Sequence, residues 1–161
     1  MSDTKQASRP TYGAGSSGPL QPAIRSLMMP KETNANGTIF GGLILSQIDL
    51  AGAIEARRYA AGKLVTVAMR EVVFVAPVYV GDLVSYYTET VRCGRTSVTV
   101  KVRVEAERQH VGPSRDDDGQ EAADRRGSGD DADRVAVTTA EVVYVHIDGD
   151  GKPIPIDCCG D

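Results

Sequence analysis

Apolar and polar residues follow two different periods along the chain, which separate a helical part from a strand-forming part. Residues 41–62 are apolar nearly all round, begin at Gly41-Gly42, and end at Gly62, a residue type that often caps helices. We therefore predict one buried helix of about five turns. Gly52 costs this helix about 1 kcal/mol relative to Ala, which indicates tight packing against a flat neighbour.

Beyond the helix, side chains alternate with a period of two and are rich in β-branched and aromatic types, which is typical of strands. The clearest alternation places Val98, Val100, Val102 and Val104 on one face and Thr99, Lys101, Arg103 and Glu105 on the other. We predict strands at residues 65–67, 72–75, 83–91, 98–105 and 135–147. Cys93-Gly94-Arg95 is predicted to form the hairpin turn before the fourth of them.

One long helix followed by four or five antiparallel strands is an α+β arrangement in which the sheet wraps around the helix. This is the layout of the hot-dog fold, and we predict one such domain over residues 23–156. The exposed edge of its sheet is expected to pair with a second copy, so a dimer is the minimal assembly. Residues 1–22 and a polar insertion at about 108–133 lack the periodicity of buried structure and are predicted to be disordered, and residues 157–161 are expected to form a C-terminal tail.

The composition indicates which kinds of molecule the protein is not expected to bind. The chain has 18 basic and 22 acidic residues and a formal net charge of -4, so no positive field favours nucleic acid. Cys93, Cys158 and Cys159 lack the spacing of a metal site and are expected to be reduced thiols. The sequence shows neither a secretory signal nor a membrane span, so we expect a cytoplasmic protein with no membrane partner.

Asp49 is the candidate for chemistry, because it is the only carboxylate between Glu32 and Glu55 and lies within an apolar run. An unpaired charge there would cost several kcal/mol. A structural acid bonded to a loop amide or to a tyrosine is one interpretation. A catalytic acid is the other, since functional sites tolerate such a cost.

The free N–H groups at Gly41 and Gly42, at the positive end of the helix dipole, suit the polarisation of a carbonyl oxygen. Asp49 follows Gly42 by seven residues, which places both on one helix face about 10.5 Å apart along the axis. Reacting groups must approach within about 3 Å, so Asp49 has to work with the glycine-rich loop of another copy.

These residues resemble the YciA-type acyl-CoA thioesterases of the hot-dog superfamily. The matching motifs are NANGTIFGG at 34–42, SQID at 46–49, FVAPVYVGD at 74–82 and GRTS at 94–97. The resemblance covers residues 27–107 and, more weakly, 135–156. It implies hydrolysis of acyl-CoA to free acid and coenzyme A, with neither a metal nor an organic cofactor.

The resemblance also implies roles for individual residues. Asp49 is the general base or the nucleophile, Asn34 positions water or substrate, and the Gly42 N–H polarises the thioester carbonyl. Asn36 is the substitute for Asn34, and both asparagines have the alternative role of turn and cap residues. The sequence does not choose between the two routes open to Asp49.

Coenzyme A carries phosphates, and the turn from Arg92 through Gly94, Arg95, Thr96 and Ser97 offers guanidinium, backbone N–H and hydroxyl groups to bind them. An ordinary exposed hairpin is the alternative. The resemblance implies self-association as a dimer and, beyond that, a hexamer formed as a trimer of dimers. A non-catalytic acyl-CoA-binding sensor of the same fold is the competing function; it has no use for an ionisable group directed at the thioester.

Overall fold

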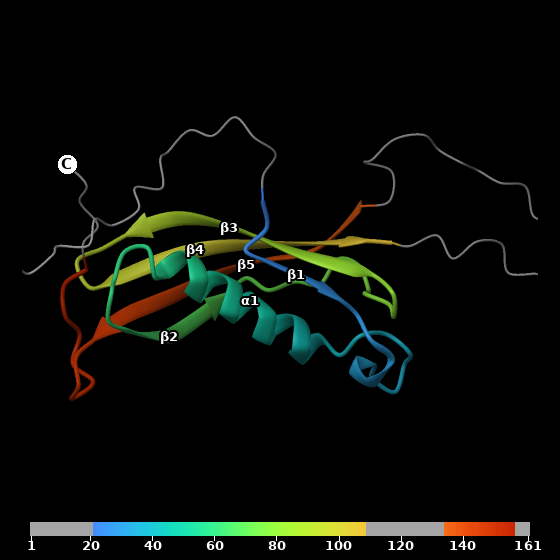
Figure 1. Ribbon diagram of the computed structural model, residues 1–161, viewed down its shortest axis with the longest axis horizontal. Coiled ribbons are helices and arrows are strands. Elements are labelled where there is room, and N and C mark those ends of the chain that lie inside the picture. Colours follow the sequence, from blue (N-terminus) through green and yellow to red (C-terminus); the bar gives the residue numbers. More distant parts are fainter. Residues whose placement is uncertain (1–20, 109–133, 157–161) are drawn as a thin grey trace, which may run out of the picture.

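The computed structural model describes residues 21–108 and 134–156. In chain order the elements are β1 (Ile24–Leu27), the short 3-10 helix η1 (Pro30–Glu32), α1 (Gly41–Ala56), β2 (Lys63–Arg70), β3 (Leu83–Cys93), β4 (Ser97–Glu107) and β5 (Arg134–Ile147). The strands form one antiparallel sheet in the order β1-β3-β4-β5-β2. The sheet curls over α1, which crosses its concave face (Figure 1). This is the predicted α+β hot-dog arrangement, with β1 and β2 as its edges.

The core forms where the alternating strands meet the helix. Every second residue of β4 from Val98 to Ala106 is fully buried. Ile44, Ile48 and Ala51 of α1 are buried against this face of the sheet. The predicted alternation along β4 is thus confirmed, because its valines face the helix while Lys101 and Arg103 face outward and are exposed.

Helix α1 is shorter than predicted. It ends at Ala56, and Arg57 is its C-cap rather than Gly62. The residues after Ala56 form a tighter, 3-10-type turn, because the N–H groups of Arg58 and Tyr59 donate to carbonyls three residues back. Gly62 has a different role: a side chain at this position would overlap the ring of His146.

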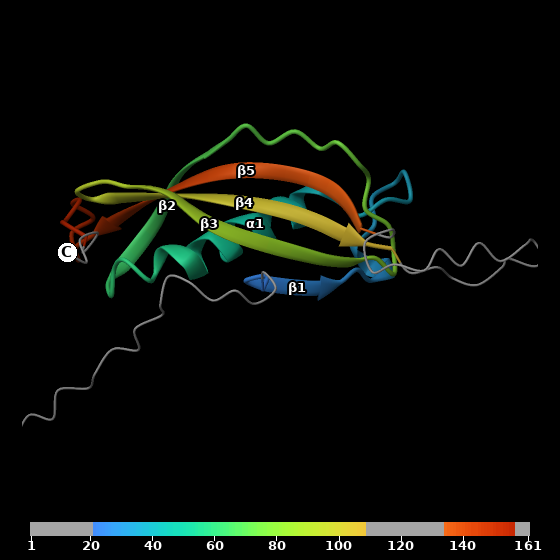
Figure 2. The ribbon, with the colours of Figure 1, turned by 90° about the horizontal axis from the view of Figure 1, so that it is seen from above.

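Two local predictions about strands are wrong. Residues 72–75 form no strand, and this stretch instead runs extended beside the start of β5 (Figure 2). A single main-chain bond from Val75 N–H to the Val137 carbonyl, at 2.9 Å, and a side-chain bond from Thr138 Oγ1 to the Val73 carbonyl, at 2.8 Å, hold it there. The four-residue edge strand β1 was not predicted, because it is too short for alternation to be distinctive.

The other predicted strands are present, with β2 extended at both ends. A β-bulge interrupts the β2–β5 register between Thr66 and Ala68. The segments predicted to be disordered and the expected C-terminal tail lie outside the described residues, apart from residues 21, 22 and 108, and remain predictions. Glu107 at the end of β4 pairs directly with Arg134 at the start of β5, and residues 109–133 lie between them in the sequence.

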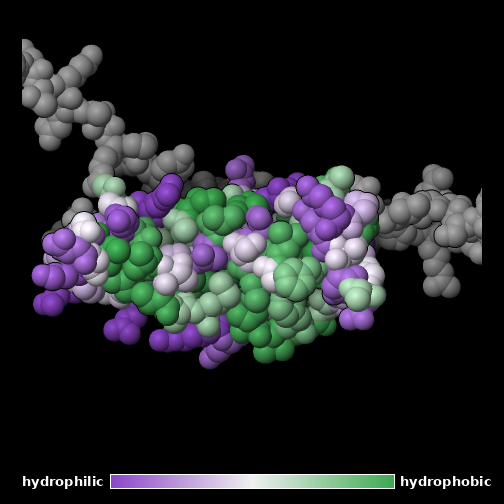
Figure 3. Space-filling model, turned by 90° about the horizontal axis from the view of Figure 1, so that it is seen from below, coloured by the Kyte–Doolittle hydropathy of each residue, from purple (hydrophilic) through white to green (hydrophobic). Residues whose placement is uncertain are grey.

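The outer face of α1 stays apolar but is not covered. Leu50 is 53% exposed and Ile54 is 50% exposed. Hydrophobic side chains gather across the middle of this side of the molecule, with polar ones toward the ends (Figure 3). The prediction of a helix buried all round therefore holds for only one of its faces in a single subunit.

Candidate active site

Asp49 lies in the middle of α1, half-buried, and is held by two hydroxyl groups from the sheet. Thr66 Oγ1 donates a hydrogen bond to Asp49 Oδ1 at 2.7 Å. The Tyr144 hydroxyl donates to the main-chain carbonyl of Asp49 at 2.6 Å and lies 3.4 Å from Oδ1. The carboxylate therefore has partners within the apolar run, and one of them is a tyrosine, as the structural interpretation required.

Thr66 and Tyr144 come from neighbouring strands. They are direct partners in the β2–β5 register, and both side chains face α1. Burial, together with the negative charge of Asp49 and its hydrogen bond, raises the pKa of Tyr144 well above its usual value. The phenol therefore stays protonated at neutral pH and remains a donor.

Sequence reasoning missed both hydroxyl residues. Thr66 is the polar member of an apolar Val-Thr-Val triplet, and Tyr144 is the hydroxyl-bearing residue in an apolar stretch of β5. Each could have been noticed as a polar side chain on a strand face that the alternation directs inward. What the pattern could not supply is the β2–β5 register that places them side by side.

The start of α1 presents two unpaired donors. Phe40 is the N-cap but provides no side-chain hydrogen bond, and within the described residues the N–H groups of Gly41 and Gly42 donate to no acceptor. The two phenylalanines of the chain flank them. A side chain at Gly42 would overlap the Phe40 ring, and a Cβ at Gly41 would lie 3.7 Å from the ring of Phe74. Two aromatic rings thus lie beside unpaired N–H groups at the start of a helix, an arrangement that suits the binding of a negatively charged oxygen.

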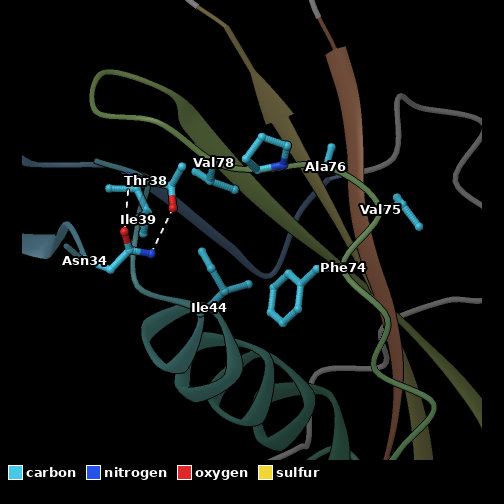
Figure 4. Close-up of a pocket in the computed structure, with 10 residues that line it drawn as sticks. Asn34, Thr38, Ile39, Ile44, Phe74, Val75, Ala76 and Val78 are labelled. Atoms are coloured by element: carbon cyan, nitrogen blue, oxygen red, sulfur yellow. Dashed lines mark hydrogen bonds between the residues drawn. The ribbon is translucent and has the colours of Figure 1, made fainter. Parts of the chain in front are cut away.

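Asn34 lies at the edge of a cavity of about 370 Å³ beside this helix start (Figure 4). Its Nδ2 donates to Thr38 Oγ1 at 2.8 Å, and its Oδ1 accepts from the N–H groups of Asn36 and Thr38. The turn also needs Gly37, whose φ of 78° is left-handed. The predicted turn role of both asparagines is therefore present, with Asn36 exposed and Asn34 facing the cavity.

The cavity is mainly apolar. Ile44 and Phe74 point toward one another across it, while Asn34 and Thr38 form its polar side (Figure 4). The full lining is Asn34, Thr38, Ile39, Gly41, Ile44, Phe74, Val75, Ala76, Pro77 and Val78. Asp49 is not part of it. One subunit thus brings Asn34 and the helix start together and holds Asp49 separately, farther along α1.

The Arg92–Ser97 hairpin lies at the same end of the sheet as Asp49. The strand register aligns Thr66, Tyr144, Val98 and Cys93 in one row across the sheet, next to the turn. The turn is fixed from inside, since the N–H of Gly94 donates to the Ser97 carbonyl at 2.7 Å.

The cationic groups of this hairpin are available to a ligand. Arg92 and Arg95 are exposed, and neither forms an ion pair with a described residue. Cys93 is disulfide-bonded, so the expectation of reduced thiols is wrong for this residue.

Among the described residues, no group of three or more His, Cys, Asp or Glu side chains gathers in a way that could hold a metal ion. No helix in the described part is long and apolar enough to cross a membrane.

Comparison with known proteins identifies the family of the chain. The family model described as Thioesterase superfamily matches residues 36–113. The acyl-CoA thioester hydrolase YciA of Salmonella typhimurium is 39% identical over 137 residues, which cover 85% of this chain and 90% of the relative.

Solved structures show the same fold. The hexameric hotdog-fold thioesterase Cj0915 of Campylobacter jejuni matches with a TM-score of 0.67 and 42% identity, covering 84% of this chain and 90% of the other. The hexameric broad-specificity acyl-coenzyme A thioesterase HI0827 matches with a TM-score of 0.67 and 35% identity, covering 88% and 84%. The chain therefore belongs to the thioesterase superfamily and, within it, to the acyl-CoA thioester hydrolases of the YciA family.

Proposed function

We propose that the protein hydrolyses acyl-CoA to a free acid and coenzyme A, with Asp49 as the acid that carries the reaction. The observation that carries this proposal is the carboxylate in the middle of an apolar helix, held at Oδ1 by Thr66 and at its main chain by Tyr144. Family membership supports the reaction type, since the relatives are named acyl-CoA thioester hydrolases.

The reaction needs three groups. The Gly42 N–H stabilises the negative charge that develops on the thioester oxygen, and Asn34 positions the substrate or water beside it. Asp49 either takes a proton from the attacking water or attacks the carbonyl carbon itself, forming an anhydride that water then opens. In both routes the C–S bond breaks, and coenzyme A leaves as a thiolate that takes up a proton. The reaction involves no change of oxidation state, so we propose that it needs no cofactor.

These groups come together between two subunits. Within one subunit Gly42 and Asp49 are about 10.5 Å apart along α1, too far to act on one carbonyl. The exposed apolar side chains Leu50 and Ile54 on the outer face of α1 support a second copy on this side, since such a face is unfavourable in water. The hexameric state named for the structural relatives supports a further trimer of dimers here.

Three further assignments belong to this proposal: the binding site for coenzyme A, the compartment and the bounds of the domain. Arg92, Gly94, Arg95, Thr96 and Ser97 bind the phosphate-bearing part of coenzyme A. This is supported by Arg92 and Arg95, which are exposed and form no ion pair with a described residue, at the sheet end that holds Asp49. We place the enzyme in the cytoplasm, where acyl-CoA is found. The folded domain spans residues 23–156.

The test is steady-state hydrolysis of a panel of acyl-CoAs, followed by release of free thiol. Asp49→Asn and Asp49→Ala are expected to lose at least about a hundredfold in kcat. Glu55→Gln is the matched control, because Glu55 also lies on α1 and accepts a hydrogen bond from a strand threonine, Thr90, at 3.0 Å. Saturable binding of acyl-CoA without thiol release would instead identify a non-catalytic sensor.

Subunit mixing tests the shared site separately. Asp49→Asn and Asn34→Ala subunits are each expected to be nearly inactive alone. A mixed dimer contains one site in which both groups are native. Random reassortment of equal amounts should therefore restore about a quarter of wild-type activity. Absence of any recovery, with exchange verified by differently tagged subunits, would place the whole site within one subunit.

A further inference from the structure

Tyr144 contacts Asp49 through the main chain rather than mainly through the carboxylate. Its hydroxyl is 2.6 Å from the Asp49 carbonyl oxygen and 3.4 Å from Oδ1. We propose that Tyr144 is a positioning residue for Asp49, and that Gly52 provides the space in the helix that allows it to act. This inference rests on the catalytic role proposed for Asp49.

The two hydroxyl groups restrain different parts of the same residue. Thr66 bonds to Oδ1 and thereby selects the direction of the side chain. Tyr144 bonds to the carbonyl and thereby sets how far this turn of α1 stands from the sheet. Because Thr66 and Tyr144 are register partners in β2 and β5, the same pair of strands holds both hydroxyls. Asp49 is thus fixed both in position and in orientation.

Gly52 explains how a tyrosine reaches a helix carbonyl. A Cβ at position 52 would overlap the Tyr144 hydroxyl, and two ring carbons of Tyr144 would lie 3.1 Å from it. Any side chain would therefore push the phenol away from the Asp49 carbonyl. Glycine at this position costs the helix about 1 kcal/mol relative to alanine, and it leaves the space that the phenol occupies.

Tyr86 shows that this contact is specific to Tyr144. Both tyrosines are almost fully buried, both face α1, and they lie on β3 and β5 of the same sheet. The hydroxyl of Tyr86 has no hydrogen-bond partner in the described part of the chain. Packing alone therefore places a tyrosine ring under this helix, whereas the bond to Asp49 is an additional feature of one of them.

Fixing Asp49 matters because catalysis depends steeply on placement. A displacement of about 1 Å of a reacting group can cost about a hundredfold in rate. Loss of the Tyr144 bond leaves the Thr66 bond in place, so a partial effect is expected. The effect should appear in kcat, because Tyr144 is buried and its hydroxyl bonds to the main chain of Asp49.

The experiment compares Tyr144→Phe with Tyr86→Phe, each in the wild type and in the Asp49→Asn variant, using thiol release at saturating acyl-CoA. Tyr144→Phe is expected to lower kcat about tenfold in the wild type, with KM changed less than about twofold. In the Asp49→Asn background the same substitution should have no further effect, because Tyr144 acts through Asp49. Tyr86→Phe should leave kcat unchanged in both.

Gly52→Ala provides a second, independent perturbation if Tyr144→Phe folds poorly, because its Cβ would overlap the Tyr144 hydroxyl. It should lower kcat in the wild type and have no further effect in the Asp49→Asn background. Unchanged kcat in Tyr144→Phe, or an equal loss in the Asp49→Asn background, would overturn the positioning role. Full activity of Asp49→Asn itself would instead overturn the catalytic role proposed for Asp49, so the two failures are distinguishable.

Discussion

Replacing Thr66 with valine removes one hydrogen bond from Asp49 and almost nothing else. Valine has nearly the shape of threonine and suits a strand, so neither a cavity nor a loss of strand propensity is expected. The lost bond is a 2.7 Å contact from a hydroxyl to a carboxylate. Bonds to charged groups contribute about 1.5–3 kcal/mol, and the exposure of Thr66 places this one at the lower end.

If that contribution serves to orient the carboxylate in the transition state, a loss of about 1.4 kcal/mol lowers kcat about tenfold. The assay is free-thiol release over a range of acyl-CoA concentrations, so that kcat and KM are obtained separately. KM should change little, because Thr66 does not contact coenzyme A in the proposed site.

Thr90→Val is the matched control. Thr90 Oγ1 donates to Glu55 Oε1 at 3.0 Å, so the same kind of bond joins a strand to a carboxylate on the same helix. The control should keep wild-type kcat. A kcat of Thr66→Val within twofold of wild type, or an equal loss in Thr90→Val, would refute the reasoning that Thr66 acts through Asp49.

Three further outcomes are expected. Leu50→Asp places a charge on the exposed face of α1 and should dissociate the assembly and abolish activity together, as measured by light scattering and thiol release; an active monomer would contradict a shared site. Val102→Ala removes two methyl groups from a fully buried position and should cost about 2 kcal/mol, or about 4–8 °C in Tm; an unchanged Tm would contradict the packing described. Burial raises the pKa of Tyr86 and of Tyr144 above the ordinary value of 10.0, so the stability that these neutral phenols contribute is fully present below pH 10 and is lost as pH rises beyond it. Chemical denaturation between pH 8 and 12 should show this decline, and Tyr86→Phe should reduce it.

The repeating pattern predicted the parts of the fold that depend on burial alone. The valines of β4 and the apolar run of α1 each have one low-energy arrangement, so helix, strands and hot-dog layout followed from them. The helix end was misplaced because its last turn is shaped by the path to edge strand β2. Residues 72–75 have strand composition, yet Thr138 bonds to their backbone through its side chain, and no sequence pattern reports that.

The site was predictable to the extent that single residues are conspicuous. An acid among aliphatic residues and a Gly-Gly helix start stand out in the sequence, and the structure describes both. Thr66 and Tyr144 were missed because they are 78 positions apart and meet only through the β2–β5 register. The space at Gly52 was anticipated as close packing, but the tyrosine that fills it was not.

The pairing of Glu107 with Arg134 bears on how the chain could be engineered. Since β4 and β5 end side by side, the 25 residues numbered 109–133 join two points that the sheet already holds together. Loop-closure entropy grows only with the logarithm of length, so replacing them with a four-residue turn would change the closure free energy by about 1.6 kcal/mol. The connection between these strands is therefore a place where a tag, a fluorophore or a second domain can be inserted at small thermodynamic cost.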